Sequence, residues 1–391
     1  PPRAAAARAE GGNGSTGMSD RWGVYVHVPW CRVQCPYCAF DVTTGPLAPG
    51  ATEGWTASVL AEHRRRRRAF PSHPPATLAF GGGTPSRVPP AAIAQLVDAV
   101  SPSGEVSLEA NPEDLDPTWL DAVVEAGVDR VSVGVQSFSL ATRKRLGRAW
   151  VSAEPERALA PLRDHPRLRS WSIDLIFAVP DQTLDDLDAD LDAIERLGPP
   201  HVALYGLTFE EGTPLHRAVR SGRMQPPNDD LWRRMYERIG ARLQALGLHR
   251  YEVSNYARPG HRSQHNELYW HDRPYLGLGP SAHGYLPDGR RYHNVRTLAA
   301  YLQHPDPTDA IETPSAEQAL LDLLVSCLRS SDGVDRDYVH ARTGLRLSDA
   351  SVRPLVDHGL LAEHGRVLVL TDDGVPVCDA VVAHLVRGTA Q

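Results

Sequence analysis

Cysteine, lysine and long apolar runs are all scarce in this sequence. Five of the 391 residues are cysteine, and so small and odd a number does not form the disulfide framework of a secreted domain. No stretch approaches the roughly 18 uninterrupted apolar residues that a membrane helix needs, and we see no apolar core of a secretory signal. We therefore expect a globular, cytoplasmic protein without a stable membrane span.

The charged residues give no sign of a nucleic-acid partner. Lys and Arg total 41 against 48 Asp and Glu, which gives a net charge of −7, so we expect no nucleic acid to bind. The arginines are scattered except for the run at 64–68, which closes a predicted helix. Cations suit the C-terminal end of a helix dipole. We interpret this run as a solvated helix end, the alternative being a site for an anionic partner.

Short β-branched runs alternate with helical stretches over the first half of the chain. This rhythm predicts parallel strands joined by right-handed crossovers. A doubly wound sheet also fits, but the unusual residues follow the strand ends and no GxGxxG follows the first strand, so we predict an α/β fold built on a partial (β/α)6 barrel of the TIM type. The expected strands are 23–28, 77–80, 105–109, 130–135, 170–176 and 201–207; the expected helices are 52–69, 89–100, 116–126, 140–162 and 184–197.

The sequence pattern divides the chain into four segments. Residues 1–20 lack periodicity and are expected to be a disordered extension, and residues 21–227 are expected to form the barrel. Residues 228–310 are an extension with a proline-containing connector from 295 onward. Residues 311–391 predict an α-rich, winged-helix-like domain. Such a domain usually suggests DNA, but its many acidic residues favour a structural or protein-contacting module.

Three of the five cysteines lie within eight residues, directly after the first predicted strand. Cys31, Cys35 and Cys38 have the spacing of metal ligands. Zinc commonly requires a fourth ligand from a second CxxC pair, and Cys327 and Cys378 lie in apolar helix patterns typical of core cysteines. Three thiolates without a fourth therefore favour an iron–sulfur cluster with one iron open to an exchangeable ligand.

The CxxxCxxC motif, with Tyr37 before its last cysteine, resembles the signature of radical S-adenosylmethionine proteins. The resemblance implies that the three cysteines bind a [4Fe-4S] cluster. It also implies that S-adenosylmethionine chelates the fourth iron and is the source of a radical that abstracts hydrogen from a substrate. In such proteins the cofactor carries the chemistry, and the protein positions it and excludes water.

Polar residues follow the later strands in a matching arrangement. Carboxylates suit ribose hydroxyls, and an arginine can clamp the carboxylate of a ligand, although each such residue alone is equally a capping or surface group. Glycines after the second strand allow close backbone approach, and a simple turn explains them as well. By resemblance, the residues expected to bind the cofactor are Tyr25, Tyr37, Gly82, Gly83, Thr84, Glu109, Gln136, Arg148 and Asp174.

Longer motifs are similar to the oxygen-independent coproporphyrinogen III oxidase-like family, from residue 21 to the C-terminus. They are GVYVHVPWC, FGGGTPS, LEANPEDL, VSVGVQSF and DLIFAVP. Two features indicate the heme-chaperone (HemW) branch of that family. The oxidases carry a fourth cysteine where this chain has Phe40, and the chain has HNxxYW at 265–270 followed by GLGPSAHG at 277–284.

The HNxxYW stretch suits a porphyrin. The His265 imidazole offers an axial ligand for haem iron, and the adjacent aromatics offer flat apolar surface. The alternative is that His265 and its neighbours are a hydrogen-bonded, packed cluster. His283 is a second candidate ligand, and we expect His27 to fix the geometry of the strand and loop.

The resemblance therefore predicts a heme chaperone that binds haem, a [4Fe-4S] cluster and S-adenosylmethionine and delivers haem to an acceptor such as a respiratory protein. An electron donor such as flavodoxin or ferredoxin is an expected partner. Two alternatives stay open: radical decarboxylation of coproporphyrinogen III, which Phe40 disfavours, and another radical tailoring enzyme. Whether the protein is an enzyme is thus left open by the sequence.

Overall fold

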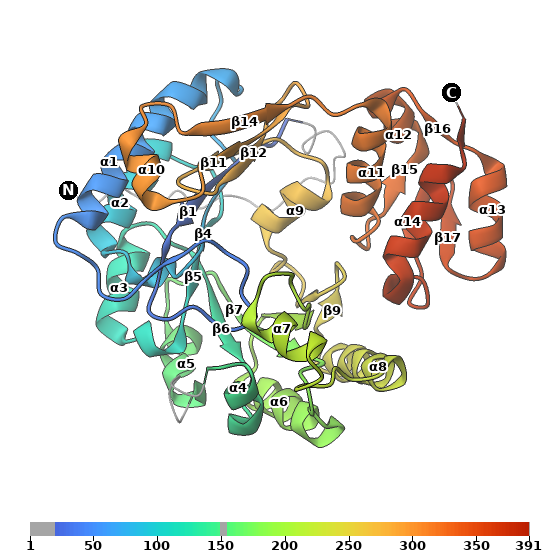
Figure 1. The fold of residues 1–391 in the computed structure, drawn as a ribbon, viewed down its shortest axis with the longest axis horizontal. Coiled ribbons are helices and arrows are strands. Elements are labelled where there is room, and N and C mark those ends of the chain that lie inside the picture. Colours follow the sequence, from blue (N-terminus) through green and yellow to red (C-terminus); the bar gives the residue numbers. More distant parts are fainter. Residues whose placement is uncertain (1–19, 149–154, 391) are drawn as a thin grey trace.

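The computed structural model describes residues 20–148 and 155–390. Residues 1–19 of the predicted extension lie outside the described residues, and so do residues 149–154 of the predicted helix at 140–162. A single sheet of twelve strands runs through the larger part of the molecule, in the order β14-β13-β12-β11-β1-β4-β5-β6-β7-β8-β10-β9. Figure 1 shows its first helices arranged along the outside of the curved sheet.

Six parallel strands form the centre of this sheet, in the order β1-β4-β5-β6-β7-β8. A helical segment follows each strand, which confirms the predicted partial barrel. The strands are β1 Gly23–Val28, β4 Thr77–Gly82, β5 Val106–Ala110, β6 Arg130–Gln136, β7 Ser170–Phe177 and β8 His201–Gly206. The helices are α1 Ala51–Arg66, α2 Pro90–Val100, α3 Pro117–Glu125, α4 Leu140–Arg145, α5 Pro155–Asp164, α6 Leu184–Leu197, α7 Pro214–Arg220 and α8 Asp229–Ala245.

The alternation of residues in β1 explains how the barrel is built. Val24, Val26 and Val28 are fully buried in the hydrophobic core, because side chains of a strand alternate between its two faces. Tyr25 and His27 point to the other face and line a cavity. One face of β1 therefore packs in the hydrophobic core, and the other face lines the interior cavity.

Further strands lengthen the sheet at both edges. Beside β1, β11 is parallel, and β12, β13 and β14 continue as antiparallel neighbours. The segment predicted as a connector contains α10 and β14, so most of it belongs to this extension. The elements are β9 His249–Arg250, β10 Asn255–Ala257, α9 Gln264–Trp270, β11 Tyr275–Leu278, β12 His283–Tyr285, β13 Arg291–Asn294, α10 Leu298–Gln303 and β14 Thr308–Glu312.

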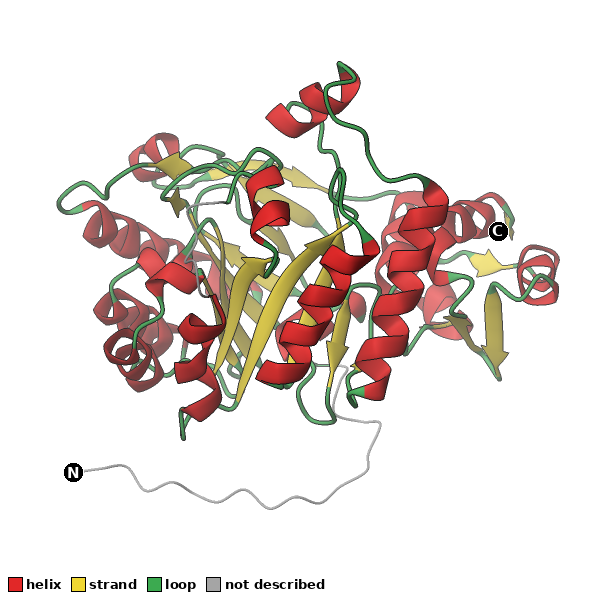
Figure 2. Ribbon diagram, turned by 90° about the horizontal axis from the view of Figure 1, so that it is seen from below, coloured by secondary structure: helices red, strands yellow, loops and turns green. Residues whose placement is uncertain are grey.

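The C-terminal region has a hydrophobic core of its own and packs beside α9 (Figure 1). Its helices and the three-stranded sheet β15-β18-β17 match the predicted α-rich, winged-helix-like arrangement. The elements are α11 Ala316–Cys327, β15 Val334–Asp335, α12 Arg336–Thr343, β16 Arg346–Leu347, α13 Asp349–Asp357, β17 Leu361–His364, β18 Val367–Leu370, α14 Cys378–Arg387 and β19 Thr389–Ala390. Figure 2 shows these helices beside the end of the large sheet.

Polar contacts join the C-terminal region to the extension. The Asp272 carboxylate accepts hydrogen bonds from Arg342 Nε at 3.0 Å, from the Tyr338 hydroxyl at 3.1 Å and from the Tyr285 hydroxyl at 2.8 Å. Two of these donors lie on α12 and one on β12, so a single carboxylate ties both parts together. None of the helices in the described ranges combines the length and apolar character needed to cross a membrane.

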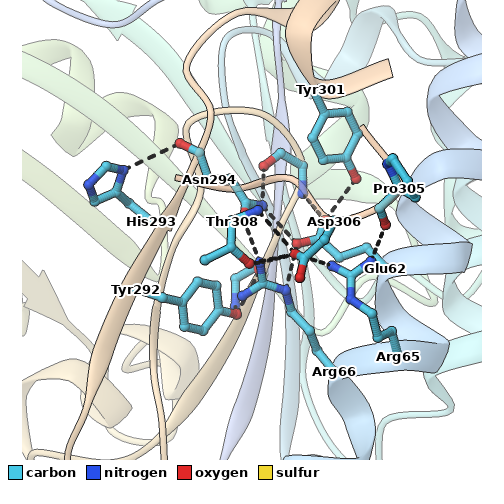
Figure 3. Close-up of polar contacts among 12 residues, drawn as sticks. Glu62, Arg65, Arg66, Tyr292, His293, Asn294, Tyr301, Pro305, Asp306 and Thr308 are labelled. Carbon is cyan, nitrogen blue, oxygen red and sulfur yellow. Dashed lines mark hydrogen bonds and ion pairs between the residues drawn. The ribbon is translucent and has the colours of Figure 1, made fainter. Parts of the chain in front are cut away.

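The interpretation of residues 64–68 as a solvated helix end is wrong for Arg66. Its Nε lies 3.0 Å from Glu62 Oε1, and its guanidinium Cζ lies 3.9 Å from the centre of the Tyr292 ring. Its Nη2 also donates to Asn294 Oδ1 at 2.8 Å and to Thr308 Oγ1 at 2.6 Å. Figure 3 shows that this end of α1 is covered by β13 and β14 of the sheet extension.

Candidate functional site

The three cysteines lie on one loop between two short strands. β2 (Trp30–Cys31) pairs in parallel with β3 (Thr43–Thr44), which closes the loop at its base. Within the loop, the Cys38 amide donates to the Cys35 carbonyl at 3.0 Å. Cys31, Cys35 and Cys38 are all partly buried and line one cavity of about 390 Å³. The fold therefore brings the three predicted ligands to a common space at the end of the parallel strands.

The surroundings of the thiols fit a cluster. Thr84 Oγ1 donates to Cys31 Sγ at 3.5 Å, and Arg148 Nη1 donates to Cys35 Sγ at 3.7 Å. Burial raises the pKa of Cys31 and of Cys38, a cost that a bound metal offsets because it favours thiolates. Among the described residues no group of three His, Cys, Asp or Glu is set to hold a single ion. Three thiols around one cavity are compatible with the iron–sulfur centre that the cysteine spacing predicts.

Most of the residues predicted to bind S-adenosylmethionine line this same cavity. They come from the ends of successive strands, as expected where parallel strands end at one face of a barrel. Tyr25 lies instead on two neighbouring cavities, and the predicted haem contact His265 lines one of these. The predicted residues that share the cavity of the cysteines are Tyr37, Gly82, Gly83, Thr84, Glu109, Gln136, Arg148 and Asp174.

The glycines after β4 bring that strand against the cysteine loop. Gly82 has a φ of +99°, and a side chain there would meet the His27 ring at 2.5 Å. The amides of Gly83 and Thr84 each donate at 2.7 Å to a backbone carbonyl at the end of β1 and in β2. These two amides are engaged by the protein itself. The glycines therefore act here by permitting close approach of the backbone.

Two carboxylates, from β5 and β7 on either side of β6, face the cavity. Asp174 accepts hydrogen bonds from Ser132 Oγ at 2.8 Å and from Ser172 Oγ at 3.0 Å, yet burial raises its pKa to about 6. Glu109 is open to the cavity but lies deep inside the barrel, where desolvation and then the charge of Asp174 raise its pKa to about 8. Hydroxyl groups of a ligand are suitable partners for such oxygens at either protonation state.

Arg148 is held in place by groups that surround the cavity. Besides Cys35, its guanidinium donates to Asn111 Oδ1 at 2.9 Å and to the Gly134 carbonyl at 3.0 Å. Gln136, two residues after Gly134, has a φ of +67° at a shift in the register between β6 and β7. This bulge turns the end of β6 at the cavity wall, a common role of bulges next to active sites.

Several residues that line this cavity were not predicted from the sequence, and three of them have polar groups inside it. Asn111 bonds Arg148 and donates to Thr84 Oγ1 at 3.3 Å, Ser132 bonds Asp174, and Tyr205 lines the cavity from β8. Ser132 carries the one signal that could have identified it: it is a small polar residue between the buried Val131 and Val133, and therefore faces the interior.

His265 lies inside the barrel, 3% exposed, near the start of α9. Its Nδ1 shares a hydrogen bond with Thr77 Oγ1 at 2.7 Å, and its Nε2 shares one with the Tyr269 hydroxyl at 2.8 Å. Its ring is stacked 6.4 Å from that of Tyr25, whose hydroxyl lies 3.2 Å from His27 Nδ1. Coordination of haem iron by His265 requires that one of its two ring hydrogen bonds breaks.

A second cavity, of about 450 Å³, adjoins that of the cysteines. Phe40 lines both cavities and is 58% exposed. We call this second space the aromatic cavity. Its other ring-bearing residues are Tyr25, His27, Tyr269, Tyr275, His283 and His293.

Comparisons with known proteins agree with this geometry. The profile described as "Radical SAM superfamily" matches residues 25–194. The chain is 36% identical to "Heme chaperone HemW" of Mycobacterium tuberculosis H37Rv, over 93% of this chain and 94% of that protein. It is 32% identical to "Heme chaperone HemW" of Escherichia coli K12, over 90% and 94%.

A mitochondrial protein and a solved structure extend the comparison. The bovine "Radical S-adenosyl methionine domain-containing protein 1, mitochondrial" is 32% identical over 94% of this chain and 88% of its own length. The structure of coproporphyrinogen III oxidase from Escherichia coli superposes with a TM-score of 0.78 at 19% identity, covering 94% of this chain and 90% of that one. The last comparison shows the shared fold alone. On the strength of the full-length relatives, the chain belongs to the HemW family of radical S-adenosylmethionine proteins.

Proposed function

We propose that the protein is a haem chaperone of the cytoplasm, which binds haem beside a cluster site and passes it to an acceptor protein. The observation that carries this proposal is the pair of adjoining cavities with different linings. One presents thiols, carboxylates and an arginine, and the other presents aromatic rings and imidazoles. The heme chaperones among its relatives, which match over most of their length, support the same function.

The first cavity suits a [4Fe-4S] cluster with S-adenosylmethionine. When bound, that pair supplies one-electron chemistry. In our proposal Cys31, Cys35 and Cys38 hold the cluster, and Glu109 and Asp174 accept hydrogen bonds from ribose hydroxyls. Arg148, fixed by Asn111 and Gly134, positions the cysteine loop through Cys35 and presents positive charge to the carboxylate of the ligand.

The aromatic cavity suits a porphyrin. Phe40, which stands where the oxidases carry a further cysteine, adds an exposed apolar ring instead of a thiol, and flat apolar rings pack well against a macrocycle. Tyr269 of the HNxxYW motif lines this cavity, and His265 bonds its hydroxyl. In our proposal the motif contributes to the haem site through Tyr269. His265 itself stays a predicted haem contact.

Two protein partners belong to the proposal. The acceptor is a protein that needs haem, such as a respiratory protein. The electron donor is a small redox protein such as flavodoxin or ferredoxin. Both expectations come from the family resemblance.

A product assay under anaerobic conditions separates this function from its main rival. Reconstituted full-length protein is incubated with S-adenosylmethionine, a reductant and coproporphyrinogen III, and in parallel haem-loaded protein is mixed with apomyoglobin. We expect no protoporphyrinogen, and we expect apomyoglobin to acquire haem. Formation of protoporphyrinogen that is lost in Cys31→Ala would establish an oxidase and overturn the proposal, and so would failure of the protein to carry haem.

A further inference from the structure

Two histidines face each other across neighbouring strands at the rim of the aromatic cavity. His283 on β12 is directly opposite His293 on β13 in the antiparallel register, so the two side chains lie on the same face of the sheet. Their ring centres are 5.5 Å apart. Both residues line the aromatic cavity, so two imidazoles reach one side of a space that we have proposed to hold haem.

The two rings are available for a ligand. Within the described part of the chain, His283 shares no hydrogen bond through its side chain, and it is exposed. His293 makes long contacts through Nδ1 alone, at 3.5 Å to the Asn294 carbonyl and at 3.5 Å to Asp309 Oδ2. Its Nε2 is therefore available to bind another group. Partial burial and the nearby His293 lower the pKa of His283, which keeps its ring neutral and able to donate a lone pair at pH 7.

The other histidines of this region are less suitable. Both ring nitrogens of His265 are hydrogen-bonded to hydroxyls in the barrel interior. His27 lines the aromatic cavity but is 5% exposed, with its ring confined against Gly82. Haem iron lies at the centre of a wide macrocycle, so an imidazole must project into open space to reach it. The two histidines on β12 and β13 have such a position.

A buried carboxylate bonds the backbone before β12 and a side chain at the end of β13. Glu62 on α1 accepts hydrogen bonds from the Gly279 amide at 3.0 Å and from Asn294 Nδ2 at 2.8 Å, and the same Nδ2 donates to the Gly279 carbonyl at 2.8 Å. Gly279 directly follows β11 and lies four residues before His283, and Asn294 directly follows His293 (Figure 3). The backbone on both sides of the histidine pair is therefore fixed to the barrel, which preorganises the two imidazoles.

The cavity beside the pair has features that a haem needs. Phe40, Tyr269 and Tyr275 supply aromatic surface, and Arg296 lies on the rim with its side chain 69% exposed. A guanidinium at the rim suits the carboxylates of haem propionates, since these groups remain near solvent while the macrocycle is buried. Arg296 already contacts Asp41 Oδ2 at 2.5 Å, so a propionate would compete with that carboxylate.

We propose that the His283–His293 pair supplies the axial imidazole to haem iron at the rim of the aromatic cavity. This inference rests on the proposed haem-chaperone function and assigns the ligand within it. Either ring can serve, because the two lie side by side on one face. A carrier gains from such a pair, since exchange of one imidazole for the other or for a ligand of the acceptor allows stepwise release of haem.

Hemin titration of the full-length protein tests the assignment. The absorption spectrum and affinity of wild type are compared with those of His283→Ala, His293→Ala, the double variant, His265→Ala and the exposed control His364→Ala. We expect each single rim variant to bind a few-fold more weakly. The double variant should lose the spectrum of imidazole-ligated iron and at least tenfold in affinity, and free imidazole should restore the spectrum.

Three outcomes contradict the inference in different ways. A wild-type spectrum and affinity in the double variant would overturn the assignment and leave the proposed function intact. Loss of the ligated spectrum in His265→Ala with an unchanged double variant would assign the ligand to the barrel interior. Absence of saturable hemin binding by wild type would overturn the proposed function and the inference together. Circular dichroism of each variant shows that loss of binding is not loss of fold.

Discussion

The three thiols of the cysteine loop have different neighbours although they share one cavity. Cys31 receives a hydrogen bond from Thr84, and Cys35 receives one from Arg148. Charge-assisted bonds to a thiolate stabilise its ionised form, so these residues outside the motif favour the state of the thiols that a metal would require. The two remaining cysteines, Cys327 and Cys378, are buried in the core of the C-terminal region.

Replacing Cys31 by Ala should abolish cluster binding. Anaerobically reconstituted wild type should hold about four irons per chain, and Cys31→Ala should hold less than one, because two thiolates do not retain the cluster. Iron and sulfide analysis measures both. Cys327→Ala is the matched control and should keep the wild-type iron content; a cluster that persists in Cys31→Ala would show that another residue is the ligand.

The Glu109 carboxylate should make stability depend on pH. Its pKa in the folded protein, about 8, is above the value of a free glutamate, so the folded state binds more protons than the unfolded state and loses stability as the pH rises from about 4.5 to 8. Glu109→Gln removes this loss. As the pH rises from 5 to 8.5, the free energy of unfolding of the variant should increase by about 1 kcal/mol relative to that of wild type. The effect is no larger because water in the cavity screens part of it.

Chemical denaturation at the two pH values measures that difference. The same variant should bind S-adenosylmethionine at least tenfold more weakly, because an amide replaces the carboxylate that we propose to accept from ribose. A stability difference that stays constant from pH 5 to 8.5 would contradict the raised pKa of Glu109.

At the scale of elements, helix α1 connects the barrel to its sheet extension. Glu62 is 1% exposed and bonds Gly279, Asn294 and the Tyr301 hydroxyl, the last at 2.8 Å. Arg66 neutralises this carboxylate at 3.0 Å, yet burial still raises the pKa of Glu62. A buried pair of this kind adds little by its charges, but removal of one partner is costly.

Glu62→Ala should therefore destabilise the protein by about 3 kcal/mol, measured by urea denaturation. It should also weaken hemin binding several-fold although it does not line the aromatic cavity, because β12 and β13 lose their anchor. Glu53→Ala, an exposed acid in the first turn of α1, is the control and should change neither property. Equal effects of the two substitutions would contradict an anchoring role for Glu62.

The central strands could be predicted from sequence to within about two residues, because their alternation is local. The alternation of Val24, Val26 and Val28 is enough to predict a strand. The anchor could not be predicted, because Glu62 and Asn294 are separated by 232 positions in the chain. The run at 64–68 was misinterpreted for the same reason: helix position predicts solvent for an arginine, and only the fold shows that Tyr292 and Thr308 cover Arg66.

Some parts of the candidate site could likewise be predicted from the sequence, and others could not. A dense motif predicted that the three cysteines act together, and the residues after the strands predicted part of the wall of the cavity that they line. The aromatic cavity needed the fold, since Phe40, Tyr269 and His293 come from distant elements. No sequence pattern indicated that His293 would lie opposite His283.

At the scale of the whole molecule, the docking of the C-terminal region includes a contact that responds to pH. His271 Nε2 lies 3.1 Å from Asp332 Oδ2. The hydrogen bond to Asp332 raises the pKa of His271, and the same bond lowers the pKa of Asp332. The stabilisation from His271 is therefore complete below its unfolded pKa of about 6.5 and is lost as the pH rises through the higher folded value.

His271→Gln should be less stable than wild type by about 0.5–1 kcal/mol at pH 5.5 and nearly equal to it at pH 9, since the contact is partly exposed. Below about pH 4 the difference should shrink again as Asp332 becomes protonated. Differential scanning calorimetry at the three pH values measures it. A deficit that is largest at pH 9 would have the wrong sign and would exclude this ion pair.

We propose above all that this chain holds haem beside its cluster site. The most direct test is a hemin titration of the anaerobically reconstituted, full-length protein, followed by absorbance of the Soret band. We predict a saturable change that ends at one haem per chain, with a spectrum of imidazole-ligated iron. A linear, unsaturated increase matching free hemin would contradict it.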